Sequence, residues 1–168
     1  MDTKKGIKIA IQKVREYAIL PAYAHENDAG MDIYAAEDMI LKPGETKAVP
    51  SGFSLAIPDG YEIQHRPRSG LSLKTMLRLP NSPGTIDAGY RDEVCVIIHN
   101  ASFLLPLEEE ILTISEKNNR HGIYKIQRGD RIAQMVFAKI EKAKWVTVSS
   151  VKEIGEDRKG GFGSTGIH

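Results

Sequence analysis

The sequence predicts an all-β fold, a jelly roll or distorted β-barrel with one short helix and a glycine-rich C-terminal tail. Short segments rich in β-branched or apolar residues recur along the chain, as is typical of strands. Many short strands with frequent turns indicate a sandwich or barrel of jelly-roll or Greek-key type. The turn sequences are KPGE at 42–45, PDG at 58–60, NSPG at 81–84 and RGD at 128–130.

Seven segments are expected to form strands. The first, IKIAIQKV at 7–14, alternates between polar and apolar residues, which is the period of a half-buried strand. The other six are short and rich in β-branched or apolar side chains. They are KAVPSGFSLAIP at 47–58, YEIQHR at 61–66, EVCVIIHN at 93–100, EILTIS at 110–115, RIAQMVFAKI at 131–140 and WVTVSSV at 145–151.

Three segments depart from the strand pattern. SGLSLKTML at 69–77 predicts a short helix, with Ser69 as a candidate N-cap and leucines at helical spacing. EKNNRHG at 116–122 is polar and predicts the tip of a surface hairpin. The tail from Gly155 contains five glycines and no periodicity, which is typical of a flexible segment.

Length and composition predict one domain of ordinary soluble type. The 168 residues suit a single β-barrel domain over 1–154, followed by an arm over 155–168. The net charge of +1, from 23 basic and 22 acidic residues, argues against a nucleic-acid partner. No apolar run approaches the roughly 18 residues that cross a membrane. The N-terminus also lacks a signal-peptide core, so we expect a cytoplasmic protein without a membrane partner.

The single cysteine, Cys95, excludes an internal disulfide framework and is typical of a reducing compartment. It lies within the apolar run VCVIIH, where a cysteine behaves as a small hydrophobic residue. We therefore expect Cys95 in the core and not as a nucleophile.

Two stretches have the composition of a phosphate site. RPRSGLS at 66–72 supplies arginine donor forks and a serine hydroxyl at the start of the expected helix. GGFGSTG at 160–166 supplies glycines that let the backbone approach a ligand, hydroxyl donors, and Phe162 for stacking on a base. The alternatives are a solvated turn for the first stretch and a flexible linker for the second.

Two aspartates are candidates for chemistry. Asp32 lies in AGMDIYA at 29–35, and Asp87 lies in GTIDAGY at 84–90, where it also suits a simple turn. Mg²⁺ bound to a polyphosphate keeps several waters and needs few protein carboxylates. A second carboxylate is then free to accept a proton from water. Two aspartates with an arginine–serine site thus favour hydrolysis of a phosphate ester or anhydride, although surface charges would look the same.

Five motifs occur in an order that resembles the trimeric dUTP pyrophosphatases, or dUTPases. Together they run from Ala29 to Gly166 and cover most of the chain. Any one of these motifs alone is weak evidence for the family, whereas all five in the same order are strong evidence. They are AGMDIYA at 29–35, PRSGLS at 67–72, NSPGTIDAGYRDEV at 81–94, RGDRIAQMV at 128–136 and RKGGFGSTG at 158–166.

The resemblance implies a jelly-roll subunit in a homotrimer whose active sites are shared between subunits, with residues 155–168 closing over a site. It implies hydrolysis of dUTP to dUMP and pyrophosphate with Mg²⁺, which limits uracil incorporation into DNA and supplies dUMP for thymidylate synthesis. Asp87 would orient and activate the attacking water. Tyr90 would pack under the deoxyribose and leave no room for a 2′-hydroxyl.

The remaining motif positions would bind the substrate or the metal. Asp32 would support Mg²⁺ through water. The uracil edge would be read by Asn81, the backbone of Gly84, Thr85, Ile86 and Asp87, and the facing strand near Cys95. The phosphates would be held by Arg68, Ser69, Gly70 and Gln134. Phe162 would stack on the uracil, and Arg158, Ser164 and Thr165 would hold the outer phosphates. Gly163, between them, would also bind the substrate.

Three features depart from the family pattern. Asp92 replaces a common glycine after DAGYR. The chain between Asn100 and Arg128 is longer than in compact members, which predicts a protruding hairpin at about 104–123. Arg158 precedes Phe162 by four residues, where members commonly have five, so Lys159 is an alternative phosphate contact.

Two other functions are weighed against dUTP hydrolysis. A dCTP deaminase shares the fold, but that branch has a second serine where this chain has Gly70. A non-catalytic nucleotide-sensing protein of the same fold is the other alternative. Asp87 and Tyr90 are both present, which argues against it.

Overall fold

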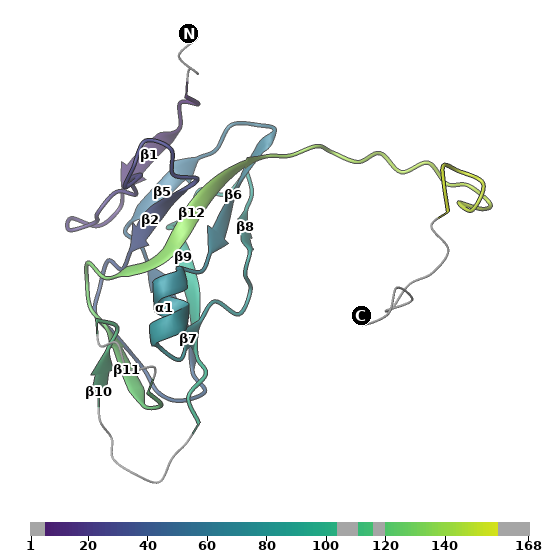
Figure 1. Ribbon diagram of the computed structural model, residues 1–168. Helices are drawn as coiled ribbons and strands as arrows, with labels where there is room; N and C mark the ends of the chain where they lie inside the picture. The colour runs from purple at the N-terminus through teal and green to yellow at the C-terminus, as the bar shows by residue number, and fades with distance from the viewer. Residues whose placement is uncertain (1–5, 104–110, 116–119, 158–168) are drawn as a thin grey trace.

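The computed structural model describes residues 6–103, 111–115 and 120–157, and within them the chain is almost entirely β (Figure 1). One helix, α1 (Ser69–Lys74), accompanies the strands of this part of the chain. The prediction of an all-β fold with one short helix is confirmed. No helix among these residues has the length and apolar character needed to cross a membrane.

The largest sheet has four strands in the order β2-β12-β6-β8. All neighbours are antiparallel, and β12 lies between β2 and β6. The sheet therefore joins the segments of the first, third and fourth motifs, and β6 ends directly before the second motif. Its strands are β2 (Gly30–Tyr34), β12 (Arg131–Lys139), β6 (Tyr61–Arg66) and β8 (Gly84–Ile86).

Three smaller sheets complete the subunit. One consists of β4 (Thr46–Pro50), β9 (Cys95–Asn100) and β7 (Leu77–Arg78), in that order. A second pairs β1 (Ala10–Lys13) with β5 (Phe53–Ala56). The third has the order β10-β11-β3, with β10 (Ile111–Thr113), β11 (Ile123–Ile126) and β3 (Met39–Leu41).

Alternating side chains of these strands build one hydrophobic core. In β9, Val96 and Ile98 are buried while Ile97 between them is exposed, as the period of a strand requires. Ile33 of β2 and Ile63 of β6 enter the same core cluster from the large sheet. The outer face of β9 is consequently left free to form the wall of a site.

Most strand predictions are confirmed, with shifts at their ends. The segment 61–66 is a strand over its full predicted length. The segment 47–58 is divided into β4 and β5 at Gly52, which has a φ of 81°. A Cβ atom at Gly52 would lie 2.5 Å from the Cβ of Ala18. Both the positive φ and the lack of space for a side chain therefore require glycine in this turn.

Three local predictions are wrong. Residues 145–151 form no strand, because none of the described strands pairs with them. The N-cap of α1 is Arg68 and not Ser69, which is the first helical residue. The pairing of β10 with β11 is parallel, so these strands do not form the antiparallel hairpin expected over 104–123.

The short strands β2, β3, β7, β8 and β11 were not expected from the sequence. They have between two and five residues, so a period of two is hard to recognise in them. After β12, Figure 1 shows the chain running away from the sheets toward the C-terminus as a long extended segment.

Candidate active site

A cavity of about 310 Å³ lies between the turn after β8 and the outer face of β9. It gathers residues from four parts of the sequence, at 48, 65, 81–90 and 94–97, and these include Asp87, the residue expected to carry the chemistry. Its lining consists of Ala48, His65, Asn81, Gly84, Thr85, Ile86, Asp87, Tyr90, Val94, Cys95 and Ile97.

Asp87 stands at the mouth of this cavity. Strand β8 ends at Ile86, whose side chain is buried in the core and fixes the strand end. The backbone N–H of Tyr90 donates to the carbonyl oxygen of Asp87 at 3.0 Å, which closes the turn. The Asp87 side chain is exposed and accessible to a substrate and to water.

Tyr90 is held at both ends. Its backbone closes the turn, and its hydroxyl donates to the carbonyl oxygen of Glu93 at 2.9 Å. Burial raises the pKa of the Tyr90 hydroxyl, with further contributions from Cys95 and Asp92, so the group remains a donor at neutral pH. The ring is thereby fixed beside Asp87, although 39% of the residue is exposed.

Gly84 allows Asn81 to approach the strand backbone. A Cβ atom at Gly84 would lie 3.0 Å from Asn81 Nδ2 and 3.5 Å from the Cβ of His65. The amide of Asn81 therefore lies against β8 at the cavity wall. Any larger residue at position 84 would displace the amide that is expected to read a base.

Cys95 is half-buried and lines the cavity, so the expectation of a core position is wrong. The reason is the alternation of β9, which turns Val96 inward and Cys95 toward the outer face. Burial raises the pKa of the Cys95 thiol, with Glu93 contributing next, and this keeps the group protonated. A protonated thiol is a poor nucleophile, which agrees with the expectation that Cys95 is not a nucleophile.

A second group of predicted residues surrounds Asp32. Its carboxylate accepts hydrogen bonds from Arg68 Nε at 2.9 Å and from Arg131 Nη1 at 3.2 Å. Gln134 is the register partner of Asp32 on the neighbouring strand β12. The structure thus brings an aspartate, two arginines and a glutamine together near the start of α1, where Ser69 is exposed.

The Asp87 cavity, as the described residues form it, does not include the group around Asp32. Arg68, Ser69, Gly70 and Gln134 are absent from the lining of the Asp87 cavity. The predicted residues Arg158, Phe162, Gly163, Ser164 and Thr165 lie outside the described residues.

Residues that the sequence did not single out also belong to the cavity region. His65 lines the wall, and its inward position follows from the alternation of YEIQHR. Glu93 follows the turn and binds Arg15 through both carboxylate oxygens. No local signal reveals that pair, because its members are 78 residues apart.

The donor set near Asp32 determines what kind of metal site is feasible. Within the described ranges, no three His, Cys, Asp or Glu side chains are grouped so that they could hold a metal ion. Both oxygens of Asp32 already face guanidinium groups. A Mg²⁺ ion that keeps its waters and is bound mainly by phosphate oxygens needs no such cluster, so the residues present here fit only that kind of site.

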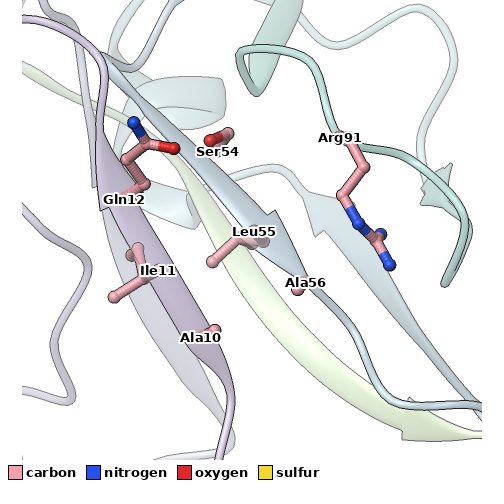
Figure 2. Close-up of a pocket in the computed structure, with 7 residues that line it drawn as sticks. All are labelled: Ala10, Ile11, Gln12, Ser54, Leu55, Ala56 and Arg91. Carbon is pink, nitrogen blue, oxygen red and sulfur yellow. The ribbon is translucent and has the colours of Figure 1, made fainter.

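A separate cavity of about 270 Å³ lies against β1 and β5 (Figure 2). Figure 2 shows the two strands side by side, with Arg91 reaching over from a neighbouring loop. One amino group of Arg91 donates to the carbonyls of Ala88 and Tyr90. The remaining lining is apolar or uncharged, so this cavity holds no group suited to catalysis.

Comparisons with known proteins agree on one family. A family model described as dUTPase matches residues 16–103 and 110–166. The deoxyuridine 5'-triphosphate nucleotidohydrolase of Solibacter usitatus is 42% identical, covering 95% of this chain and 97% of the relative. That of Ehrlichia canis is 44% identical, covering 99% of this chain and 100% of the relative.

Solved structures give the same result. The dUTPase of Staphylococcus bacteriophage 80alpha with dUpNHpp superposes with a TM-score of 0.86 at 30% identity, covering 95% of this chain and 99% of the other. A dUTPase variant from phage phi11 of S. aureus, described with a structural Mg(II) ion, has a TM-score of 0.78 at 30% identity. It covers 86% of this chain and 98% of its own.

Proposed function

The chain belongs to the dUTPase family and hydrolyses dUTP to dUMP and pyrophosphate; we propose that Asp87 orients and activates the attacking water. The observation that carries this mechanism is the cavity in which Asp87, Tyr90 and Asn81 meet the backbone of β8. By removing dUTP and producing dUMP, the reaction limits uracil incorporation into DNA and supplies thymidylate synthesis.

The cavity suits a pyrimidine deoxynucleoside. Asn81 and the backbone from Gly84 to Ile86 read the uracil edge, and Cys95 bounds the pocket on the opposite side. Tyr90, whose hydroxyl is held by a carbonyl, packs under the deoxyribose and excludes a 2′-hydroxyl. Fixed polar groups that bind the edge of the base give selectivity for the base. A wall that leaves no room for an additional hydroxyl gives selectivity for the sugar.

Asp87 is placed for general-base catalysis. Its carboxylate is exposed at the cavity mouth and is free to align a water and accept its proton as the water attacks the α-phosphorus. Arg68, Ser69, Gly70 and Gln134 bind the phosphate chain and stabilise the negative charge that develops on pyrophosphate. Asp32 would hold a Mg²⁺ ion through water, and the ion would supply positive charge to this stabilisation.

A homotrimer with shared active sites accounts for the two separate groups of residues. The Asp87 cavity lacks the phosphate-binding residues of its own subunit, so another subunit provides them. The extended segment after β12 supports the same assembly, because Trp145 is 93% exposed and Val146 is 82% exposed. Residues 155–168 then close over a neighbouring site through Arg158, Phe162, Gly163, Ser164 and Thr165, in a cytoplasmic enzyme that needs no nucleic acid or membrane.

The test is the variant Asp87→Asn, assayed with dUTP and with dCTP in the presence of Mg²⁺. Loss of a positioned base typically costs about 10²–10⁴ in rate, so pyrophosphate release from dUTP falls by that factor. The asparagine is isosteric and the side chain is exposed, so the melting temperature and assembly stay unchanged.

The matched control is Asp59→Asn, an exposed aspartate in the turn between β5 and β6 that does not line the cavity. This variant is expected to retain full activity. Turnover of Asp87→Asn close to that of the control would refute the role of Asp87. For the wild-type protein, ammonia release from dCTP would instead identify a deaminase. Release of neither pyrophosphate nor ammonia would identify a nucleotide-binding protein without catalytic activity.

A further inference from the structure

Glu93 lies where the chain returns from the cavity turn to β9, and its carboxylate is firmly held. Arg15 donates from Nε to Oε1 at 2.7 Å and from Nη2 to Oε2 at 3.0 Å. The backbone N–H of Gly52 donates to Oε1 at 2.8 Å. A bidentate guanidinium pair with a third donor fixes the orientation of the carboxylate as well as its position.

Arg15 is itself anchored to the body of the subunit. Its backbone N–H donates to the carbonyl of Gly52 at 3.2 Å, just beyond the end of the pairing of β1 with β5. Its Nη1 donates to Glu37 at 2.6 Å. The pair therefore connects the cavity turn to a rigid part of the fold and not to a mobile surface group.

Glu93 also determines where the Tyr90 ring lies. The carbonyl oxygen of Glu93 accepts the hydrogen bond of the Tyr90 hydroxyl at 2.9 Å. The next residue, Val94, is fixed by its N–H donating to the carbonyl of Phe53 at 2.9 Å. The carbonyl that holds Tyr90 thus lies between two anchors, the Glu93 side chain and the Val94 backbone.

We propose that the Arg15–Glu93 ion pair is a positioning device that holds the Tyr90 ring at the cavity wall and so sets the preference for deoxyribose over ribose. The inference rests on the proposed contact of Tyr90 with the sugar. Tyr90 is 39% exposed, so packing alone leaves it freedom to move. A displaced ring would open the space that a 2′-hydroxyl needs.

An ordinary stabilising role makes a different prediction. Exposed ion pairs contribute little to stability, whatever their location. Another surface ion pair, Lys125 with Asp38 at 2.9 Å, does not line the cavity and serves as the comparison. Only the pair that holds Tyr90 should change the choice between dUTP and UTP.

The experiment measures kcat and KM for dUTP and UTP with the full-length enzyme, Arg15→Met and Lys125→Met. Because small misplacements of a contact cost up to about 10²-fold, we expect Arg15→Met to reduce the dUTP/UTP ratio of kcat/KM about tenfold. This change in the ratio should lie mainly in the KM values, because Asp87, the proposed base, is not displaced and kcat is therefore little affected. Lys125→Met keeps the wild-type ratio, and Arg15→Lys recovers only part of it because lysine lacks the donor fork.

A double-mutant comparison separates this inference from the proposed function. Tyr90→Phe removes the hydroxyl that Glu93 holds, so combining it with Arg15→Met should add little to either change alone. Additive effects, or an unchanged ratio in both Arg15→Met and Glu93→Gln, overturn the inference while leaving dUTP hydrolysis intact. A wild-type enzyme that does not distinguish dUTP from UTP overturns the proposed role of Tyr90 itself.

Discussion

Asp32 is only 8% exposed, and both of its carboxylate oxygens face arginines. A nearly buried carboxylate needs such compensation, because an unpaired charge in this position would be strongly destabilising. The side chain therefore orients Arg68 from β2 before any metal is bound. Its proposed contact with Mg²⁺ through water comes in addition to this role, which the sequence did not reveal.

His65 makes stability depend on pH. It is 6% exposed, its Nε2 has no hydrogen-bond partner within the described chain, and burial lowers its pKa from 6.5 to about 4. Below pH 6.5 the unfolded chain binds a proton that the native state does not bind, so stability is full above this pH and falls as the pH drops toward 4. The shift corresponds to at most about 3 kcal/mol.

The variant His65→Leu should remove this part of the pH dependence. Leucine carries no titrating group, and it also removes a buried polar atom whose lack of a partner costs about 1–3 kcal/mol. Urea unfolding at several pH values between 4 and 7.5 measures the change. The control is His25→Leu, which replaces an exposed histidine. If stability fell with pH as steeply in His65→Leu as in the wild-type protein, His65 would not be the source of the pH dependence.

The segment after β12 shows that a strand pattern is insufficient without a partner. Residues 145–151 have strand composition, yet they pair with no strand in the part of the chain that the structure describes. Strand hydrogen bonds join separate segments, so the pattern favours a strand only where another segment is available. Apolar residues that stay exposed here are therefore candidates for burial in the proposed homotrimer.

Trp145, the single tryptophan of the chain, reports on this burial. In an isolated subunit it is 93% exposed, so its fluorescence emission should be that of tryptophan in water. Association that covers the segment should shift the emission to shorter wavelength. The measurement is the emission maximum across a dilution series, with sedimentation velocity giving the oligomeric state. Water-like emission from a verified trimer would show that the segment is not an interface.

At the scale of the whole molecule, the proposed mechanism brings the two groups of site residues together from different subunits. The Asp87 cavity lies between β8 and β9, and the arginine cluster lies where β2 and β12 meet the start of α1. Each group is complete within a subunit, whereas the proposed reaction needs both in contact with one substrate. Assembly is therefore part of the proposed catalytic mechanism.

Mixing two inactive variants tests this arrangement. One is Asp87→Asn, and the other is truncated after Asp157 and lacks the tail. If the tail closes over a neighbouring subunit's site, co-refolded mixed trimers contain sites with an intact Asp87 and an intact tail. Pyrophosphate release should then exceed that of either variant refolded alone. A mixture no more active than its parts would show that each site uses the tail of its own subunit.

The all-β class and the identities of the motif residues were determined by the sequence alone. Strand composition, turn residues and motif order are local properties, so they can be read without coordinates. The same reasoning identified Asp87 and Tyr90, whose cavity the structure describes. It failed at Cys95, where one step in the alternation of β9 decides between core and cavity wall.

Only the tertiary structure decided which distant residues meet. Arg15 and Glu93 are far apart in the chain, as are Asp32 and Arg131, and neither pair has a local pattern. The break at Gly52 likewise depends on Ala18, which packs against it from another segment. Contacts between segments follow from strand pairing and core packing, which involve the whole chain at once, and these contacts place the groups that act on the substrate.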